Sequence, residues 1–347
     1  MRSNLRTVIV LAVAAGLVAL FLNNVDLGGV ARGVLEARPE WLLLSLSCTI
    51  LSLAIRSLRW QFLLEPLGPT SFANAFRATA VGFAASAVLP ARAGEVIRPY
   101  FLARQSRRAS AQAIDTTGAF ATVVVERLLD VITVIILLAT YLFGFGRELG
   151  LEQPRAFAAA KWSAGVFGAG ALGVLAVSLL MARDAAPLLR LSARAMRPLP
   201  ARLATVIEGF LTKFVWGLGT LRRPGRLLGA LAWSFPLWLS IAMGVWSVAL
   251  AFRLAVPFTG TFLLIALLVI GVAVPTPGSI GGFHEAFRVG VTTFYGVRDG
   301  AAVAAAIVLH LITIVPSLVL GLLFAAQEGL SVTGLRRLAD QAAQPTP

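Results

Sequence analysis

The chain has 347 residues, of which 58% are hydrophobic and only 13% charged, and its mean hydropathy is +0.85. A soluble domain has no core large enough to hide that much apolar sequence, so the composition predicts an all-α polytopic membrane protein. The net charge of +14 is explained by loop charges that fix orientation and contact anionic lipid, and no motif for binding nucleic acid is present. Cys48 is the single cysteine, which excludes a disulfide framework and a thiolate metal site.

The chain begins with two apolar segments that we interpret as full spans. Residues 7–22 form a retained first helix, because "NNVDLGG" follows where the small residues of a signal-peptide cleavage site are expected. The second span begins at residue 41 and continues as "AIRSLRWQFLL". Arg56, Arg59 and Trp60 suit a helix end at the headgroups, where basic side chains snorkel and indole rings anchor.

An interrupted region follows. Residues 72–104 contain "LPARAGEVIRPY", which places two prolines, a glycine and three charges directly after an apolar run. Residues 111–145 then have helical composition and carry "ERLLD" in their interior. We take them as the third span.

The second half repeats this order of elements. Residues 162–181 span the membrane again, and residues 185–226 form a basic amphipathic connection. The fifth span, residues 227–252, is rich in tryptophan, and residues 258–295 are interrupted at "PTPGSIGGFHE". The last span covers residues 301–326.

The distribution of basic residues predicts the orientation. Residues 183–226 carry nine basic and two acidic side chains, and residues 92–108 carry five basic ones, so both segments are predicted to be cytoplasmic. Residues 23–40 carry two basic and three acidic side chains and are predicted to be external. With both termini cytoplasmic, six full spans and two opposed re-entrant hairpins result, all within a single membrane domain over residues 1–347.

The two interrupted regions suggest an inverted repeat. Each tip has proline and glycine followed by an acidic residue, and paired interrupted segments mark the binding site in many transporters. Backbone without helical hydrogen bonds must be buried in protein or face water, so two such breaks predict a polar cavity between the hairpins. Two unrelated kinks are the alternative. The predicted breaks are at Pro90, Gly94, Pro275, Pro277, Gly278 and Gly281.

Charged residues within the apolar regions are the candidate site residues, since each costs about 2.5 to 3.5 kcal/mol at mid-membrane unless it faces a cavity or a partner. Arg92 and Arg98 outnumber the one nearby acid, Glu95, so they suit either a lipid phosphate or bulk anionic headgroups. The other candidates are Asp115, Glu126, Arg127, Asp130, His284, Glu285, Arg288 and His310.

Two groups of these candidates admit structural alternatives. Glu126 and Asp130 share a helix face and Arg127 can pair with Asp130, which fits a salt-bridged helix junction as well as ligand contact. Glu285 and His310 could relay protons, although a lone histidine on an apolar helix also serves in packing. No zincin pattern and no Walker loop occur, so neither a metal nor any other cofactor is predicted.

The motifs "AIRSLRW", "LPARAGEVIRPYFLAR", "ERLLD" and "PTPGSIGGFHEAF", in this order, resemble the flippase-like transmembrane family that includes the membrane region of lysylphosphatidylglycerol synthase. The resemblance covers nearly the whole chain. It implies a membrane domain that binds a phospholipid or related amphiphile and moves it between leaflets. The soluble aminoacyl-transferring domain that would follow in the full synthase is absent from this sequence, so lysyl transfer is not expected. The family residues correspond to Pro90, Arg92, Gly94, Glu95, Arg98, Glu126, Arg127, Asp130, Pro275, Pro277, Gly278, Gly281 and Glu285.

The sequence therefore predicts a lipid translocator of a bacterial-type inner membrane, without enzymatic activity. Arg92 and Arg98 would hold an anionic lipid headgroup, while Glu95 and Glu285, with His284 and Arg288 beside them, would complete the polar cavity. One alternative is an intramembrane enzyme that modifies a lipid. Another is an accessory subunit that recruits a lipid-synthesis enzyme or glycosyltransferase through residues 185–226. The sequence indicates no oligomeric state.

Overall fold

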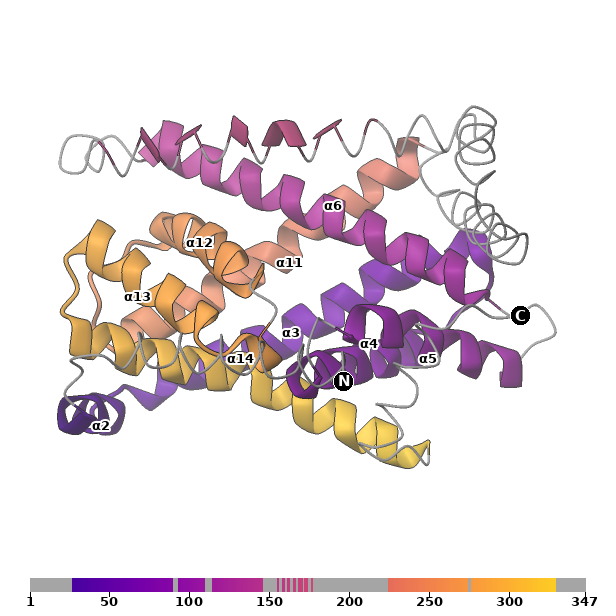
Figure 1. Cartoon of the computed structure of the whole chain (residues 1–347), viewed down its shortest axis with the longest axis horizontal. Helices are drawn as coiled ribbons and strands as arrows, with labels where there is room; N and C mark the ends of the chain where they lie inside the picture. Colours follow the sequence, from indigo (N-terminus) through magenta and orange to yellow (C-terminus); the bar gives the residue numbers. More distant parts are fainter. Residues whose placement is uncertain are drawn as a thin grey trace, which may run out of the picture.

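The computed structural model describes residues 27–89, 93–109, 114–145, 224–273 and 276–328, together with scattered positions between 155 and 176. All regular elements in the described ranges are helical (Figure 1). In chain order they are α2 (Leu27–Leu35), α3 (Pro39–Leu64), η1 (Glu65–Leu67), α4 (Phe72–Val88), α5 (Gly94–Ala109), α6 (Thr116–Thr140), η2 (Tyr141–Phe145), α11 (Pro224–Ala251), η4 (Phe258–Gly260), α12 (Thr261–Ala273), η5 (Pro277–Ser279), α13 (Gly282–Tyr295) and α14 (Asp299–Gln327).

Four helices are long and apolar enough to cross a membrane: Pro39–Leu67, Thr116–Phe145, Gly225–Ala251 and Asp299–Gln327. Each has at least 27 residues, or about 40 Å at 1.5 Å per residue, against a hydrocarbon core of about 30 Å. Together with the all-helical architecture, they confirm a polytopic α-helical membrane protein. The predicted spans over residues 7–22 and 162–181 lie outside the described residues, apart from a few positions of the fourth span. Of the predicted connection over residues 185–226, only residues 224–226 are described, and they begin α11.

The first interrupted region forms an antiparallel helical hairpin of α4 and α5. The two helices meet at glycine: a Cβ on Gly94 would overlap the carbonyl oxygen of Gly82 and the hydroxyl of Ser86, and a Cβ on Gly82 would press on Arg98. With 17 and 16 residues, α4 and α5 are about 25 Å long, shorter than the hydrocarbon core. This length fits the re-entrant prediction, which stays a prediction because helix length alone does not locate helix ends in a bilayer.

The second interrupted region forms a corresponding hairpin of α12 and α13. A Cβ on Gly271 would overlap the carbonyl oxygen of Gly282, so here too glycine permits a close crossing. The tip between the helices has two glycines with positive φ, Gly278 at 61° and Gly281 at 88°. Side chains rarely adopt such angles, so the sequence "PGSIGG" is what allows the chain to reverse here.

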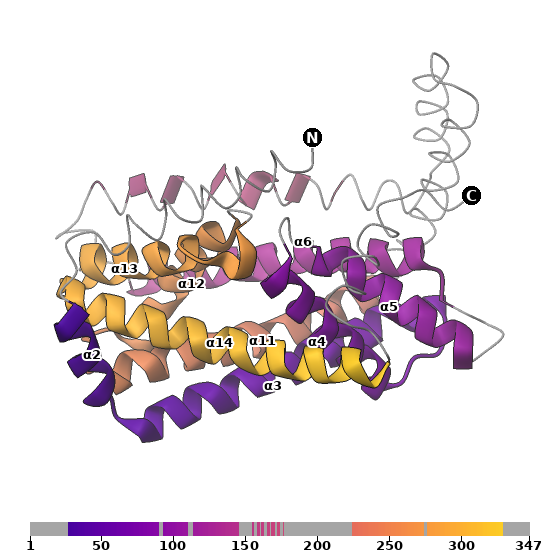
Figure 2. The same cartoon turned by 60° about the horizontal axis from the view of Figure 1, so that its bottom comes forward.

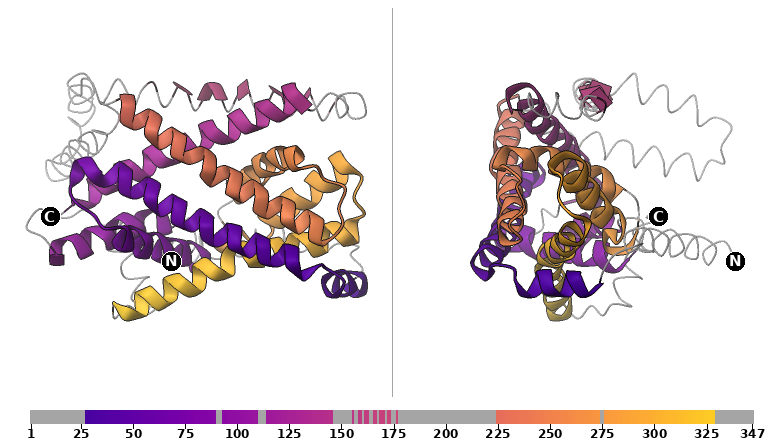
Figure 3. Two further views of the ribbon diagram at one scale, coloured as in Figure 1. Left: turned by 180° about the vertical axis from the view of Figure 1, so that it is seen from behind. Right: turned by 90° about the vertical axis from the view of Figure 1, so that its left-hand side faces the viewer.

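The spans that precede the hairpins, α3 and α11, pack antiparallel along their whole length (Figure 3). Arg38 at the start of α3 donates its backbone N–H to the carbonyl of Ala251 at the end of α11, and Arg226 at the start of α11 pairs with Glu65 at the end of α3. An inverted repeat requires corresponding helices to run in opposite directions, and these two helices do.

The remaining helix contacts fit the same inverted repeat, in which α3, α4, α5 and α6 of the first half correspond to α11, α12, α13 and α14 of the second. α14 packs on α4 as α6 packs on α12, and α5 packs on α6 as α13 packs on α14. Figure 2 shows α14 running past both hairpins, with α12 and α13 toward one end and α4 and α5 toward the other. η5, in the tip of the second hairpin, contacts α4 of the first hairpin. These contacts fit the inverted repeat suggested by the paired breaks, and the re-entrant placement of the hairpins stays a prediction.

Candidate functional site

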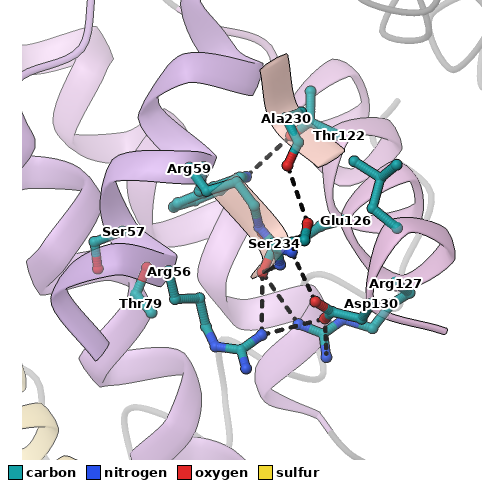
Figure 4. Close-up of polar contacts among 12 residues, drawn as sticks. Arg56, Ser57, Arg59, Thr79, Thr122, Glu126, Arg127, Asp130, Ala230 and Ser234 are labelled. Carbon is teal, nitrogen blue, oxygen red and sulfur yellow. Dashed lines mark hydrogen bonds and ion pairs between the residues drawn. The ribbon is translucent and has the colours of Figure 1, made fainter. Parts of the chain in front are cut away.

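A buried cluster of charges lies where α3, α5, α6 and α11 meet (Figure 4). Its acidic members are the first and last residues of "ERLLD" on α6: Glu126 is fully buried and Asp130 is 4% exposed. They are one helical turn apart, so both carboxylates face the same neighbouring helices. Asp130 also pairs with Arg127 at 3.2 Å, as the three-residue spacing predicts.

Two arginines of α3 supply most of the opposing charge. Arg59 lies 3.1 Å from Glu126 and 2.7 Å from Asp130, and Arg56 lies 3.4 Å and 3.2 Å from the same carboxylates. Arg56 is 8% exposed, and Arg59 and Trp60 are fully buried. The prediction that these three residues anchor a helix end at the headgroups is therefore wrong. Carboxylates on α6 give the arginines partners inside the bundle, so they have no need to snorkel.

Helix α11 joins the cluster through two residues that the sequence analysis missed. The indole of Trp238 donates to Asp130 at 3.0 Å, and Arg59 donates to the hydroxyl of Ser234 at 2.7 Å. Both belong to the tryptophan-rich span, but nothing local singles them out. The charged pairs were foreseeable: arginines three residues apart in one apolar helix match acids four residues apart in another.

Arg98 connects the cluster to a cavity. One nitrogen of its guanidinium, Nη1, lies 3.1 Å from Glu126, and the guanidinium stacks on the ring of Trp60 with 3.8 Å between the guanidinium carbon and the ring centroid. Arg98 is 4% exposed, and its Nε and Nη2 atoms have no hydrogen-bond partner among the described residues. A buried guanidinium with unsatisfied donors is costly, so a ligand that accepts these hydrogen bonds would be stabilising.

The cavity beside Arg98 lies between the two hairpins and has a volume of about 300 Å³. The first hairpin lines one side of the cavity and the second hairpin lines the other. Residues of α6 and α14 complete its wall. Its lining residues are Thr79, Gly82, Phe83, Ser86, Ala87, Gly94, Glu95, Arg98, Val123, Arg127, Val272, Thr276, Gly278, Ser279, Phe283, His310, Thr313, Ile314 and Ser317. Its volume is at the lower end of the range for small-molecule sites, about 300 to 1,000 Å³.

Positive charge is in excess around this cavity. The cluster contains four guanidinium groups, from Arg56, Arg59, Arg98 and Arg127, and two buried carboxylates. Glu95 adds a third carboxylate at the cavity rim, 3.9 Å from Arg127. Among the described residues one positive charge therefore remains uncompensated even with Glu95 counted, which favours an anionic ligand.

The second hairpin presents a largely uncharged face to the cavity. Nε2 of His310 lies 2.8 Å from the carbonyl oxygen of Gly278 and ties the tip to α14. The rings of His284 and His310 are 4.3 Å apart, and Nδ1 of His284 accepts the backbone N–H of Gly281 at 3.3 Å. The two histidines thus hold the tip in shape, and of the two only His310 lines the cavity.

Three predicted site residues lie elsewhere. Glu285 and Arg288 do not line the cavity; they pair with each other at 2.7 Å, and Arg288 also pairs with Asp299. Their helix turns these side chains toward the start of α14, whereas the sequence analysis placed Glu285 and Arg288 in the polar cavity. Asp115 caps α6 by accepting the N–H groups of Thr117 and Gly118. Pro90, Arg92 and Pro275 lie outside the described residues.

Fold and site together define a class: an all-helical integral membrane protein in which two helical hairpins enclose a cavity edged by a buried cationic cluster. The chain matches the family described as the lysylphosphatidylglycerol synthase TM region over residues 7–321, and it belongs to that family. Membership assigns it a lipid-related role in the membrane.

One curated relative gives a weaker match. The chain is 28% identical over 128 residues to the UPF0104 membrane protein MJ1595 of Methanocaldococcus jannaschii. The match covers 36% of this chain and 36% of that protein, so it spans about a third of the relative's length.

Proposed function

We propose that the protein translocates an anionic phospholipid, or a related amphiphile, between leaflets by carrying its headgroup through the cavity between the hairpins. The observation that carries the proposal is Arg98: a buried guanidinium at the cavity wall with two nitrogens that have no hydrogen-bond partner among the described residues. A phosphate oxygen accepts such hydrogen bonds well, since the planar guanidinium matches its geometry.

The electrostatics of the cavity support an anionic headgroup. The excess guanidinium charge lies on one wall, and α5 begins at the cavity with Gly94 and Glu95 among its lining residues. The N-terminus of a helix carries partial positive charge and unpaired N–H groups, which suits anions. α13 starts similarly close, because its second residue, Phe283, also lines the cavity.

The size of the cavity supports transport of the headgroup alone. About 300 Å³ accommodates a phosphorylated headgroup but not two acyl chains. The chains would stay in the bilayer while the headgroup crosses, so the polar part alone would need a protein environment.

The proposal also states that the lipid is not chemically changed, and it states in which membrane the protein acts. The lipid would leave with its covalent structure unchanged, so the protein would be a transporter rather than an enzyme. It would act in a bacterial-type inner membrane with both termini cytoplasmic. Mass spectrometry of the lipid before and after incubation with the purified protein tests the first point, since a new covalent product would contradict it.

The transport proposal is tested in vesicles. Purified protein is reconstituted in phosphatidylcholine vesicles that contain phosphatidic acid or phosphatidylinositol with a fluorescent acyl chain, and dithionite reports the lipid in the outer leaflet. Wild-type protein should exchange both anionic lipids. Arg98→Gln should slow exchange about tenfold or more, because charged hydrogen bonds to the phosphate are lost.

Two further variants separate binding from folding. Arg77→Gln is the matched control: Arg77 also lies on the first hairpin but packs over Phe324 and does not line the cavity. It should exchange lipid at the wild-type rate. Ile314→Trp fills the cavity without removing a charge and should block exchange. Folded Arg98→Gln and Ile314→Trp proteins that exchange lipid like wild type would refute the proposal.

A further inference from the structure

A second, smaller cavity lies next to the first. It has a volume of about 160 Å³ and is enclosed by α3, α11 and α14, with one side chain from α4. Its lining residues are Ser45, Thr49, Ile50, Ser52, Leu53, Arg56, Phe83, Ser240, Ile241, Gly244, Val245, Leu309, Thr313, Pro316 and Ser317. Six of them carry hydroxyl groups.

Most of these hydroxyls can offer a ligand only an acceptor. Thr49, Ser52 and Ser240 each donate their proton to a carbonyl one turn earlier in their own helix, at 3.1, 2.8 and 2.7 Å. Thr313 and Ser317 on α14 do the same. Because the proton is already used, the oxygen lone pairs are what remain for a ligand.

Ser45 gives a second, independent sign of a ligand. Its residue is fully buried, it lines the cavity, and its hydroxyl has no hydrogen-bond partner among the described residues. A buried hydroxyl without a partner is destabilising.

Packing alone does not explain this lining. Small and hydroxyl-bearing residues do let membrane helices approach closely, and Gly244 packs near Ser45 and Cys48 in that way. A seam of that kind, however, closes the space between the helices. Here about 160 Å³ stays open, room for roughly five water molecules at about 30 Å³ each.

The second cavity adjoins the first through shared walls. Phe83, Thr313 and Ser317 line both. Arg56, a member of the cationic cluster, lines the second cavity and lies over the ring of Phe83 at 5.5 Å. A headgroup whose phosphate is held by Arg98 in the first cavity would therefore have the second cavity, with its acceptor groups, on the other side of Phe83.

We propose that the second cavity binds the uncharged, hydroxyl-bearing part of the translocated headgroup, a polyol attached to the phosphate. This inference rests on the proposed function and adds the substrate class. The hydroxyls of a polyol would donate to the lone pairs of the lining side chains, and one would satisfy Ser45. An ammonium group fits less well, because Arg56 repels it and the lining residues that the structure describes include no carboxylate.

Native mass spectrometry of the detergent-solubilised protein tests this subsite by binding alone. The probes are phosphatidylinositol, phosphatidic acid and phosphatidylserine with identical acyl chains. Wild-type protein should prefer phosphatidylinositol to both other lipids. A Ser45→Ala, Thr49→Val variant should lose about fivefold of that preference for each hydrogen bond removed, with its affinity for phosphatidic acid unchanged.

Ser47→Ala is the matched control, since the Ser47 hydroxyl lies on the same helix, bonds its own backbone and does not line the cavity. It should keep the wild-type preference. Equal wild-type binding of phosphatidylinositol and phosphatidic acid would overturn the inference, as would a preference for phosphatidylserine or an equal loss of both lipids in the variant. Should the double variant fail to fold, Thr49→Val alone carries the same comparison.

The vesicle assay separates this inference from the proposed function. A polyol preference in binding together with no exchange of any lipid would refute translocation and leave the subsite standing. Exchange of anionic lipids without a polyol preference in binding would refute the subsite and leave translocation standing.

Discussion

At the residue scale, Glu126 holds the cationic cluster together. It is fully buried and lies within 3.4 Å of four arginines, from α3, α5 and α6. Glu126→Gln would leave these guanidinium groups with one buried carboxylate, and removing one partner of a buried ion pair costs about 3 to 5 kcal/mol. We expect a large drop in melting temperature in detergent, measured by intrinsic fluorescence.

The exposed ion pair between Glu65 and Arg226 gives the control for that measurement. Glu65 has a side chain that is 59% exposed, so Glu65→Gln should change the stability by less than about 1 kcal/mol. Equal melting temperatures for the Glu126→Gln and Glu65→Gln proteins would show that the buried cluster does not stabilise the bundle.

Phe83 carries a prediction about the path between the two cavities. Its ring is a wall of both, and no other large aromatic side chain of the described residues lines both. Phe83→Ala would join the two cavities, so we expect faster lipid exchange in vesicles, while Phe83→Trp should slow it. Unchanged exchange in both folded variants would mean that Phe83 does not lie on the path of the headgroup.

The sequence predicted some residues of the site better than others. Arg98, Glu126 and Asp130 were foreseen because charge inside an apolar run requires a partner or a cavity. Arg56 and Arg59 were misplaced, since a basic residue near a helix end suits the headgroups equally well by pattern. Only the packing of α3 on α6 and α11 decides between the two.

At the element scale, the hairpins were predictable because proline and glycine interrupt an apolar run at both tips. Their side-chain directions were not, because a rotation of α13 by a fraction of a turn decides whether Glu285 or Phe283 faces the cavity. The tip conformation follows from a few positions, and Gly281 at φ 88° is one of them. Local sequence thus determines the breaks, and tertiary packing determines what they enclose.

The close crossing of α4 and α5 gives the prediction at this scale. Gly94→Ala would push a methyl group into the carbonyl of Gly82, which must move the helices apart at a cost of about 1 to 3 kcal/mol. Gly300→Ala on α14 is the control, since a Cβ there meets nothing within 4 Å. We expect a lower melting temperature for the first variant only. Equal values would show that the hairpin tolerates separation of its helices.

At the scale of the whole molecule, the correspondence between the two halves of the inverted repeat explains why one wall of the cavity is charged and the other is not. Corresponding helices occupy corresponding places. Within the described parts of the chain, however, the arginines and acids of the cluster come from the first half alone, while the second half contributes Ser234, Trp238 and the histidine-bound tip. Backbone symmetry thus creates the space between the tips, and divergence of the side chains gives it a cationic side.

The opposed orientation of the hairpins is tested by labelling from either side of the membrane. Cys48 is replaced by alanine, and single cysteines are introduced at Arg104, on α5, and at Arg253, directly after α11. If the first hairpin enters from the cytoplasm and the second from outside, a membrane-impermeant maleimide added to intact cells should label Arg253→Cys and spare Arg104→Cys until the cells are opened. The Cys48→Ala protein without an added cysteine should not react. Labelling of both positions from the same side would rule out opposed hairpins, and a cavity that both leaflets can reach in turn would then need a different topology.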